Sequence, residues 1–272
     1  MLLQRQVRQK DICRLDDVAL MKGLPMNQLP PFAEEVLTPA HPCRRVLLLS
    51  NSIQYGRDYL DHAETEVRRF LGPVRRVLFF PYAMFDHAAY ATKNILRFLA
   101  MDFVMESVHT ATDPRAAVEN AEAVFIGGGN TFRLLTALYD RRLLEPLRAR
   151  VRQGMPYIGS SAGSVVAGPT LQTTNDMPIV YPPSFTSLGL VDFQINAHYV
   201  DHDPDSPHRG ETREERLLQY HEENVHPVLA LREGAMLEAN GNRYRLRGHT
   251  GARLYRRDSP PEELPAETVI RV

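Results

Sequence analysis

The chain has 272 residues, of which 43% are hydrophobic and 24% are charged, so it can bury one large α/β core or two small ones. Its formal net charge of -1 excludes the overall basic charge that draws proteins to nucleic acids or to anionic membrane surfaces. The 2 cysteines exclude a disulfide framework and a cysteine-rich zinc site, and they favour a reducing compartment.

Residues 1–43 differ from the rest of the chain. They have weak periodicity and a proline-rich composition, with prolines at Pro25, Pro30, Pro31, Pro39 and Pro42. We interpret 1–43 as an N-terminal extension and 44–272 as a single α/β domain. The N-terminus lacks the apolar run of a signal peptide, and no stretch approaches the ~18 apolar residues of a membrane span. We therefore expect a cytoplasmic protein that binds neither a membrane nor nucleic acid.

From Arg44 onward, short apolar runs alternate with amphipathic segments. The apolar runs predict buried strands at 46–49, 77–80, 104–108, 123–126 and 156–158. The amphipathic segments predict helices up to about residue 70, at 87–100, from 114 onward, at 131–139 and at 144–153. This alternation is typical of a parallel sheet with helices on both faces, which is a three-layer α/β sandwich.

The last third of the chain has a different pattern. A strand at 193–197 leads into His198, and another is expected at 228–231. Thr212 and Glu215 have the spacing of a capping box, which predicts a helix from there to about residue 223. Asn240-Gly241 is typical of a type I′ turn between two more strands. We therefore expect β-hairpin additions near the C-terminus of the α/β domain.

A possible nucleophile follows the strand at 156–158. The segment 159–163 reads GSSAG, with Ser161 at its centre, and leads into a sequence that can begin a helix. Glycines on both sides of a serine permit the tight turn that exposes its hydroxyl, and the next backbone N–H faces developing negative charge. Ser160 and Ser164 lack such flanking glycines. The alternative interpretation is a Gly/Ser-rich loop without a chemical role.

A second glycine-rich segment follows the strand at 123–126. Gly127, Gly128 and Gly129 precede Asn130 and a helix, and consecutive glycines let backbone N–H groups converge on an oxyanion or a phosphate. A Rossmann motif would need glycine where Phe132 stands, and a P-loop would need a following Gly-Lys-Ser/Thr. The remaining alternatives are an oxyanion hole and an ordinary turn.

Four segments together resemble the peptidase E family of aspartyl dipeptidases. They are GGGNTF at 127–132, the serine turn at 159–163, TTNDMPIV at 173–180 and GETRE at 210–214. The resemblance extends from about Arg44 to the C-terminus. It implies a flavodoxin-like sheet related to cyanophycinase and to class I glutamine amidotransferases. It also implies hydrolysis of dipeptides with an N-terminal aspartate, without a cofactor.

The resemblance also implies roles for individual residues. Ser161 corresponds to the family's nucleophile and His198 to its histidine. Two positions are associated with the catalytic acid, and both are occupied here, by Asp176 and by Glu233; the sequence does not choose between them. Arg213 corresponds to the arginine that binds the aspartyl carboxylate of the substrate.

Elementary chemistry agrees with these roles. A serine hydroxyl needs a base, histidine is the usual one near neutral pH, and a carboxylate fixes the imidazole tautomer. The backbone N–H of Ala162 and one from Gly128 or Gly129 would hold the oxyanion. Asn130 joins Arg213 as a candidate substrate-binding residue.

The sequence departs from the family pattern at two places. The family often has tryptophan before the serine, where this chain has Ser160, so that wall of the pocket is expected to be smaller or wetter. The segment between His198 and Gly210 also differs locally.

Several alternatives remain open at this point. His198 could be a structural histidine, Asp176 could hold the substrate's ammonium or cap a turn, and Arg213 could be a solvated residue. Histidines and aspartates at 198–208 suggest a metal site, but Pro204 and Pro207 prevent a helix from presenting two histidines on one face. We therefore expect no metal.

The function itself also has alternatives. They are a cyanophycinase-like or isoaspartyl peptidase and a catalytically silent binding protein. Glutamine amidotransfer is disfavoured because no cysteine follows Cys43. The expected partner is a small peptide substrate, and the chain is expected to be a monomer or a homodimer.

Overall fold

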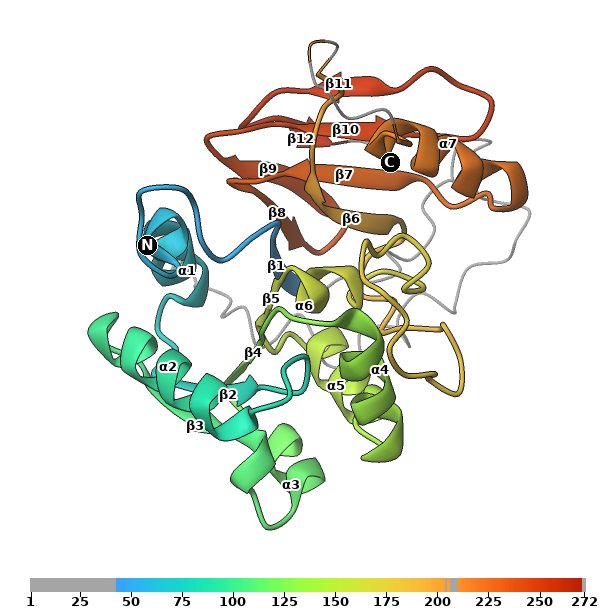
Figure 1. Cartoon of the computed structure of the whole chain (residues 1–272). Helices are drawn as coiled ribbons and strands as arrows, with labels where there is room; N and C mark the ends of the chain where they lie inside the picture. Colours follow the sequence, from blue (N-terminus) through green and yellow to red (C-terminus); the bar gives the residue numbers. More distant parts are fainter. Residues whose placement is uncertain (1–42, 204, 206–209, 271–272) are drawn as a thin grey trace, which may run out of the picture.

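The computed structural model describes residues 43–203, 205 and 210–270 (Figure 1). The expected extension at 1–43 therefore lies outside the described residues, except for Cys43, and the domain boundary stays a prediction. Pro204 and Pro207 also lie outside the described residues.

The larger of two sheets has the strand order β12-β9-β8-β1-β5-β4-β2-β3. Its parallel strands are β1 (Arg45–Leu49), β2 (Arg76–Phe80), β3 (Val104–Ser107), β4 (Ala123–Ile126) and β5 (Tyr157–Ser160). The order β3-β2-β4-β5-β1 reproduces the flavodoxin-like 2-1-3-4-5 arrangement, with the fifth place taken by the first strand of the chain. The antiparallel strands β8 (Ala235–Asn240), β9 (Arg243–Gly248) and β12 (Val269–Ile270) extend the sheet beyond β1.

Helices cover both faces of this sheet because its parallel strands are apolar on both sides. Leu47 and Leu49 pack into a core cluster with α1 (Glu64–Leu71) and α2 (His87–Ala100). Val46 and Leu48 point to the opposite face, which is covered by α3 (Pro114–Glu119), α4 (Thr131–Asp140), α5 (Leu144–Arg152) and α6 (Ala162–Val165). The 3₁₀ helices are η6 (Asp61–Ala63) and η7 (Val108–Thr110). The expected three-layer α/β sandwich is thus confirmed.

A second sheet, which the sequence did not predict, follows from the C-terminal third (Figure 1). Its order is β11-β10-β7-β6, with β6 (Gln194–Tyr199) parallel to β7 (Val228–Arg232), while β10 (Ala252–Tyr255) and β11 (Glu262–Leu264) are antiparallel. Leu229 and Leu231 on one face join the main core. Val228 and Ala230 on the other face pack with Leu217 of α7 (Arg213–Glu223). The C-terminal additions are therefore more than a hairpin.

The hairpin between β8 and β9 is present, but its turn lies one residue later than expected. Asn240 pairs with Arg243, so the loop consists of Gly241 and Asn242. Gly241 takes the left-handed conformation, with φ of 56°. Among the described residues, no helix combines the length and the hydrophobicity that crossing a membrane requires.

Candidate active site

Ser161 lies at a sharp turn between β5 and α6. Its φ and ψ are 51° and -109°, a strained conformation for a residue with a side chain. A Cβ atom on Gly159 would lie 2.4 Å from the carbonyl oxygen of Gly163, and one on Gly163 would lie 2.1 Å from that of Ile126. Both glycines are therefore required sterically, as a nucleophile elbow demands. The helix that follows is a single turn.

His198 and Glu233 lie in line with Ser161. The Nε2 atom of His198 is 2.9 Å from Ser161 Oγ, and its Nδ1 atom is 2.7 Å from Glu233 Oε1. An ionised carboxylate only accepts hydrogen bonds, so Nδ1 carries the proton and Nε2 accepts from the serine hydroxyl. The side chains of His198 and Glu233 are 41% and 52% exposed, so the arrangement is open to a substrate from solvent.

Asp176, the other candidate acid, has different partners. Its Oδ2 accepts from the Thr131 backbone N–H at 2.7 Å, from the Thr131 hydroxyl at 2.5 Å and from the Thr174 hydroxyl at 3.2 Å. It therefore satisfies an N–H group at the start of α4, directly after the glycine segment. No hydrogen bond from Asp176 to His198 occurs in the part of the chain that the structure describes.

The glycine segment after β4 lies against the serine turn. A Cβ atom on Gly128 would be 3.1 Å from Ser161 Cβ. Gly129 has φ of 133°, and a Cβ atom there would lie 2.5 Å from the carbonyl oxygen of Ala83, so only glycine fits. Ala162, which directly follows the serine, is 1% exposed. The three candidate oxyanion donors are thus grouped around Ser161.

Tyr90 of α2 lies beside the same loop. Burial raises the pKa of its hydroxyl. The candidate donors for an oxyanion are the N–H groups of Gly128, Gly129 and Ala162. None of the three donates a hydrogen bond to a backbone carbonyl within the described residues.

Asn130 has a structural environment. Its Oδ1 accepts from the Arg133 N–H at 3.0 Å, which caps α4, and its Nδ2 donates to the carbonyl of Met177 at 2.9 Å. Both ends of the amide are therefore engaged. Its role in substrate binding stays a prediction.

Arg213 is the first residue of α7, and it lies within the expected capping box, in which Thr212 is the N-cap and Glu215 the third helical residue. Its Nη1 donates to Asn175 Oδ1 at 2.7 Å, and Asn175 Nδ2 donates to the carbonyl of Ala197, next to His198. Burial, and to a smaller extent Arg216, lowers the pKa of the guanidinium. Among the described residues no carboxylate pairs with Arg213, so this half-buried cation is available to an anionic ligand.

Two residues at the end of β1, which the sequence analysis did not single out, hold His198 and Glu233 in place. Ser50 Oγ accepts from the His198 N–H at 2.9 Å and donates to the Leu231 carbonyl at 2.8 Å. Asn51 Oδ1 accepts from the N–H of Gly234, the residue after Glu233. The available signal was their position, because polar residues that follow a buried parallel strand lie at the edge where sites form.

The support at Ser50 matters because the backbone of His198 is unusual. His198 has φ of 55°, and the pairing of β6 with β7 shifts register around it, between Asn196 and Tyr199. A bulge of this kind re-aims a side chain, here toward Ser161.

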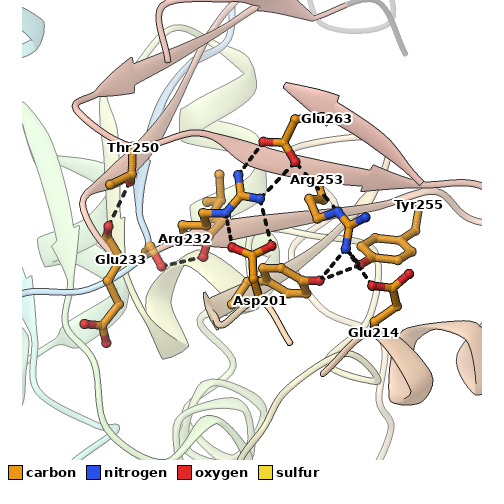
Figure 2. A network of polar contacts seen from close by, with 11 residues as sticks. Asp201, Glu214, Arg232, Glu233, Thr250, Arg253, Tyr255 and Glu263 are labelled. Carbon is orange, nitrogen blue, oxygen red and sulfur yellow. Dashed lines mark hydrogen bonds and ion pairs between the residues drawn. The ribbon is translucent and has the colours of Figure 1, made fainter. Parts of the chain in front are cut away.

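A network of ion pairs braces the second sheet behind the site (Figure 2). Arg232, next to Glu233, pairs bidentately with Asp201, which lies three residues after His198, and also with Glu263. The hydrogen bonds from Arg232 hold the pKa of Asp201 below its usual value. Figure 2 shows the Glu233 carboxylate pointing away from this network, while its carbonyl accepts from Thr250.

The same network continues to α7. Arg253 of β10 donates to the carboxylate of Glu214 at 2.6 Å and to the hydroxyl of Tyr199 at 3.1 Å. Glu214 follows Arg213, so the network connects the helix that carries Arg213 with the strand that carries His198.

A pocket of about 430 Å³ opens beside Ser161, within the range typical of small-molecule sites. It is lined by Ser52, Ile53, Tyr59, Met84, Tyr90, Lys93, Gly128, Gly129, Ser161, Asp176 and His198. Arg213 lines a neighbouring pocket of about 340 Å³. Ser160 is fully buried and does not line the pocket. The serine at this position, where the family often has tryptophan, therefore does not itself form a wall of the pocket.

No group of three or more histidine, cysteine, aspartate or glutamate side chains suited to a metal ion occurs among the described residues. His198 uses its two ring nitrogens for Ser161 and Glu233.

Comparison with known proteins gives consistent matches. The model of "Peptidase family S51" matches residues 46–247. A peptidase E of Streptomyces coelicolor is 53% identical over 219 residues, which cover 80% of this chain and 90% of that protein. A Drosophila melanogaster protein named "Probable alpha-aspartyl dipeptidase" is 45% identical over 224 residues, covering 81% and 93%.

A solved structure agrees in fold. The structure of a peptidase from an acI-B1 Actinobacterium gives a TM-score of 0.59 at 14% identity, covering 85% of this chain and 98% of that one. At such identity the likeness concerns the fold alone.

Proposed function

The chain belongs to peptidase family S51, and from this premise we propose that it hydrolyses dipeptides with an N-terminal aspartate through an acyl-enzyme on Ser161. The observation that carries the proposal is the unbroken line from Ser161 Oγ through His198 to Glu233, with contacts of 2.9 and 2.7 Å. A relative that is 45% identical carries the name alpha-aspartyl dipeptidase, which supports the choice of substrate.

In the first half of the proposed reaction, His198 Nε2 takes the proton of Ser161 as its oxygen attacks the scissile carbonyl. Glu233 holds the imidazole in the tautomer that leaves Nε2 free, and it stabilises the imidazolium that forms. The N–H group of Ala162 and one from Gly128 or Gly129 would receive the oxyanion.

In the second half, the imidazolium of His198 donates its proton to the leaving amine, and the C–N bond breaks. A water molecule, deprotonated by the same imidazole, then attacks the acyl-enzyme and releases aspartate. The open approach to His198 and Glu233 supports this step, because water reaches the imidazole after the amine has left.

Selectivity for aspartate is assigned to Arg213. A guanidinium fork matches a carboxylate bidentately, and the net charge of -1 gives the chain no general attraction for anions. The hydrogen bonds from Arg213 to Asn175 and from Asn175 to Ala197 support a fixed position relative to His198.

The experiment that tests the proposal combines labelling with turnover. A fluorophosphonate probe should label the wild type, and Ser161→Ala should abolish labelling and lower kcat for Asp-Leu by about 10⁵–10⁶. Ser160→Ala is the matched control, because it removes the neighbouring hydroxyl, which is buried outside the pocket, and it should stay active.

Full labelling of Ser161→Ala, or retained turnover by it, would contradict the proposal. A panel of α-Asp, β-Asp and aspartate-arginine polymer substrates separates the dipeptidase from the isoaspartyl and cyanophycinase-like alternatives. Absence of both labelling and turnover in the wild type would favour the silent binding protein.

A cytoplasmic location, a small peptide as the sole partner and a monomeric or homodimeric state remain predictions from the sequence. Cell fractionation and light scattering are the measurements that test them.

A further inference from the structure

The pocket beside Ser161 contains charges for which the proposed reaction has no use so far. The charged side chains that line this pocket are those of Lys93 and Asp176. Asp176 is held by Thr131 and Thr174, whereas Lys93 reaches the pocket from α2. The same cavity that holds the nucleophile therefore carries an ammonium group.

Lys93 is placed by a rigid support. Its Nζ lies 4.1 Å from the centroid of the Tyr59 ring, a cation–π contact. The Tyr59 hydroxyl donates to Asn94 Oδ1 at 2.9 Å, and Asn94 Nδ2 donates to the Tyr90 carbonyl. Tyr90 and Lys93 are three residues apart and share a face of α2, so the ammonium and the oxyanion loop are positioned by the same surface.

The ammonium of Lys93 is also not neutralised by the protein. Across residues 43–203, 205 and 210–270, none of the ion pairs involves Lys93, although many of the arginines there have carboxylate partners. The nearby walls at Ile53 and Met84 are apolar and partly exposed. An exposed but fixed cation beside apolar walls suits a ligand that combines an apolar group with a carboxylate.

The chemistry of the proposed substrate supplies that carboxylate. A dipeptide Asp-X carries an ammonium group and two carboxylates, one on each side of the scissile bond. Bond lengths place both carboxylate carbons within about 5 Å of the scissile carbonyl carbon, so each needs a cation that reaches the pocket of Ser161. Lys93 lines that pocket directly, and it is a second cation besides Arg213.

We infer that Lys93, held over the ring of Tyr59, binds the free C-terminal carboxylate of the dipeptide. This inference rests on the proposed function and names the group that makes the enzyme a dipeptidase. Arg213 takes the side-chain carboxylate, Lys93 takes the terminal one, and Asp176 is the anion that remains for the substrate's ammonium. The charges of the site then match those of an Asp-X zwitterion one by one.

The test uses two substrates that differ only in this carboxylate, Asp-Leu and its C-terminal amide, Asp-Leu-NH₂. The wild type should prefer Asp-Leu by about 10- to 100-fold in kcat/KM, the value of one hydrogen-bonded charge pair. Lys93→Met should remove this preference by slowing Asp-Leu alone, and Lys93→Arg should keep most of it. Arg115→Met removes another exposed cation, far from the pocket, and should change neither substrate.

Two outcomes would overturn the inference while the proposed function stands. One is an equal loss on Asp-Leu and Asp-Leu-NH₂ in Lys93→Met, which would make Lys93 a general structural residue. The other is a loss of discrimination between Asp-Leu and Asn-Leu, which would assign Lys93 to the side-chain carboxylate. Failure of the wild type to cleave any of these substrates would instead contradict the proposed function itself.

Discussion

The two residues that face each other across the site both have a strained backbone conformation. Ser161 and His198 both have positive φ, 51° and 55°, although neither is glycine. Such conformations persist only where the surroundings enforce them. At Ser161 the turn packs so closely that its neighbours must be glycines, and at His198 a bulge bends the strand. The strain has a chemical result, because it turns a hydroxyl and an imidazole toward one another at 2.9 Å.

The choice between the two candidate acids is testable at this scale. Glu233→Gln should lower kcat by about 10²–10⁴-fold, because the amide can present its N–H to Nδ1 and stabilise the wrong imidazole tautomer. Asp176→Asn should instead reduce stability, since it weakens the bonds to Thr131 at the start of α4, and raise KM, since Asp176 is assigned to the substrate's ammonium. Kinetics, pH–rate profiles and thermal unfolding of both variants measure the difference. A larger loss of kcat in Asp176→Asn would reverse the assignment.

At the scale of elements, the end of β1 connects the two strands that carry the acid and the base. Ser50 bonds to the backbone of His198 in β6 and of Leu231 in β7, and Asn51 bonds to the turn that contains Glu233. These contacts fix the relative position of two side chains that a flexible loop would leave free, and preorganisation of this kind lowers the barrier.

Ser50→Ala should therefore affect catalysis more than a buried hydroxyl normally does. It leaves the His198 N–H and the Leu231 carbonyl without this partner, and we expect kcat for Asp-Leu to fall by about 10- to 100-fold. Ser187→Ala is the matched control, because Ser187 is equally buried but its hydroxyl, among the described residues, donates only to the Phe185 carbonyl, at 3.4 Å. A pH–rate profile that stays unchanged in Ser50→Ala, with kcat equal to that of the control, would contradict the positioning role.

Elements defined by local signals were predictable from the sequence. The strand at 123–126 and the helix at 87–100 coincide with β4 and α2, because apolar runs and helical periodicity are local properties. The partner of His198 was not predictable, because Asp176 and Glu233 are both carboxylates and the choice depends on tertiary contacts. The strands β10 and β11 were missed since they are short and carry Arg253, Glu262 and Glu263, which are typical of a surface loop.

At the scale of the whole molecule, the site lies where the two sheets meet. Ser161 follows β5 of the larger sheet, whereas His198 and Glu233 belong to β6 and to the end of β7 in the smaller one. Arg213 comes from α7, which covers the outer face of the smaller sheet. The nucleophile and the groups that act on it thus come from separate layers, joined by a shared core cluster.

The position of Arg213 on α7 leads to a prediction about specificity. Arg213→Met should lower kcat/KM for Asp-Leu by about 10- to 100-fold and leave the slow hydrolysis of Asn-Leu nearly unchanged. Arg115→Met, which removes an exposed cation of α3, is the control. Equal losses on both substrates in Arg213→Met would show that this arginine does not select aspartate.

The division of the site between two sheets has a consequence for synthesis of the protein. The ribosome releases Ser161 well before Glu233, and the strand that flanks β7 on its outer side, β10, emerges later still. Until the last third of the chain has folded, Ser161 has no positioned base. We therefore expect the nascent chain not to hydrolyse peptides. Hydrolysis requires the strands of the last third of the chain to be packed against the larger sheet, because His198 and Glu233 come from them.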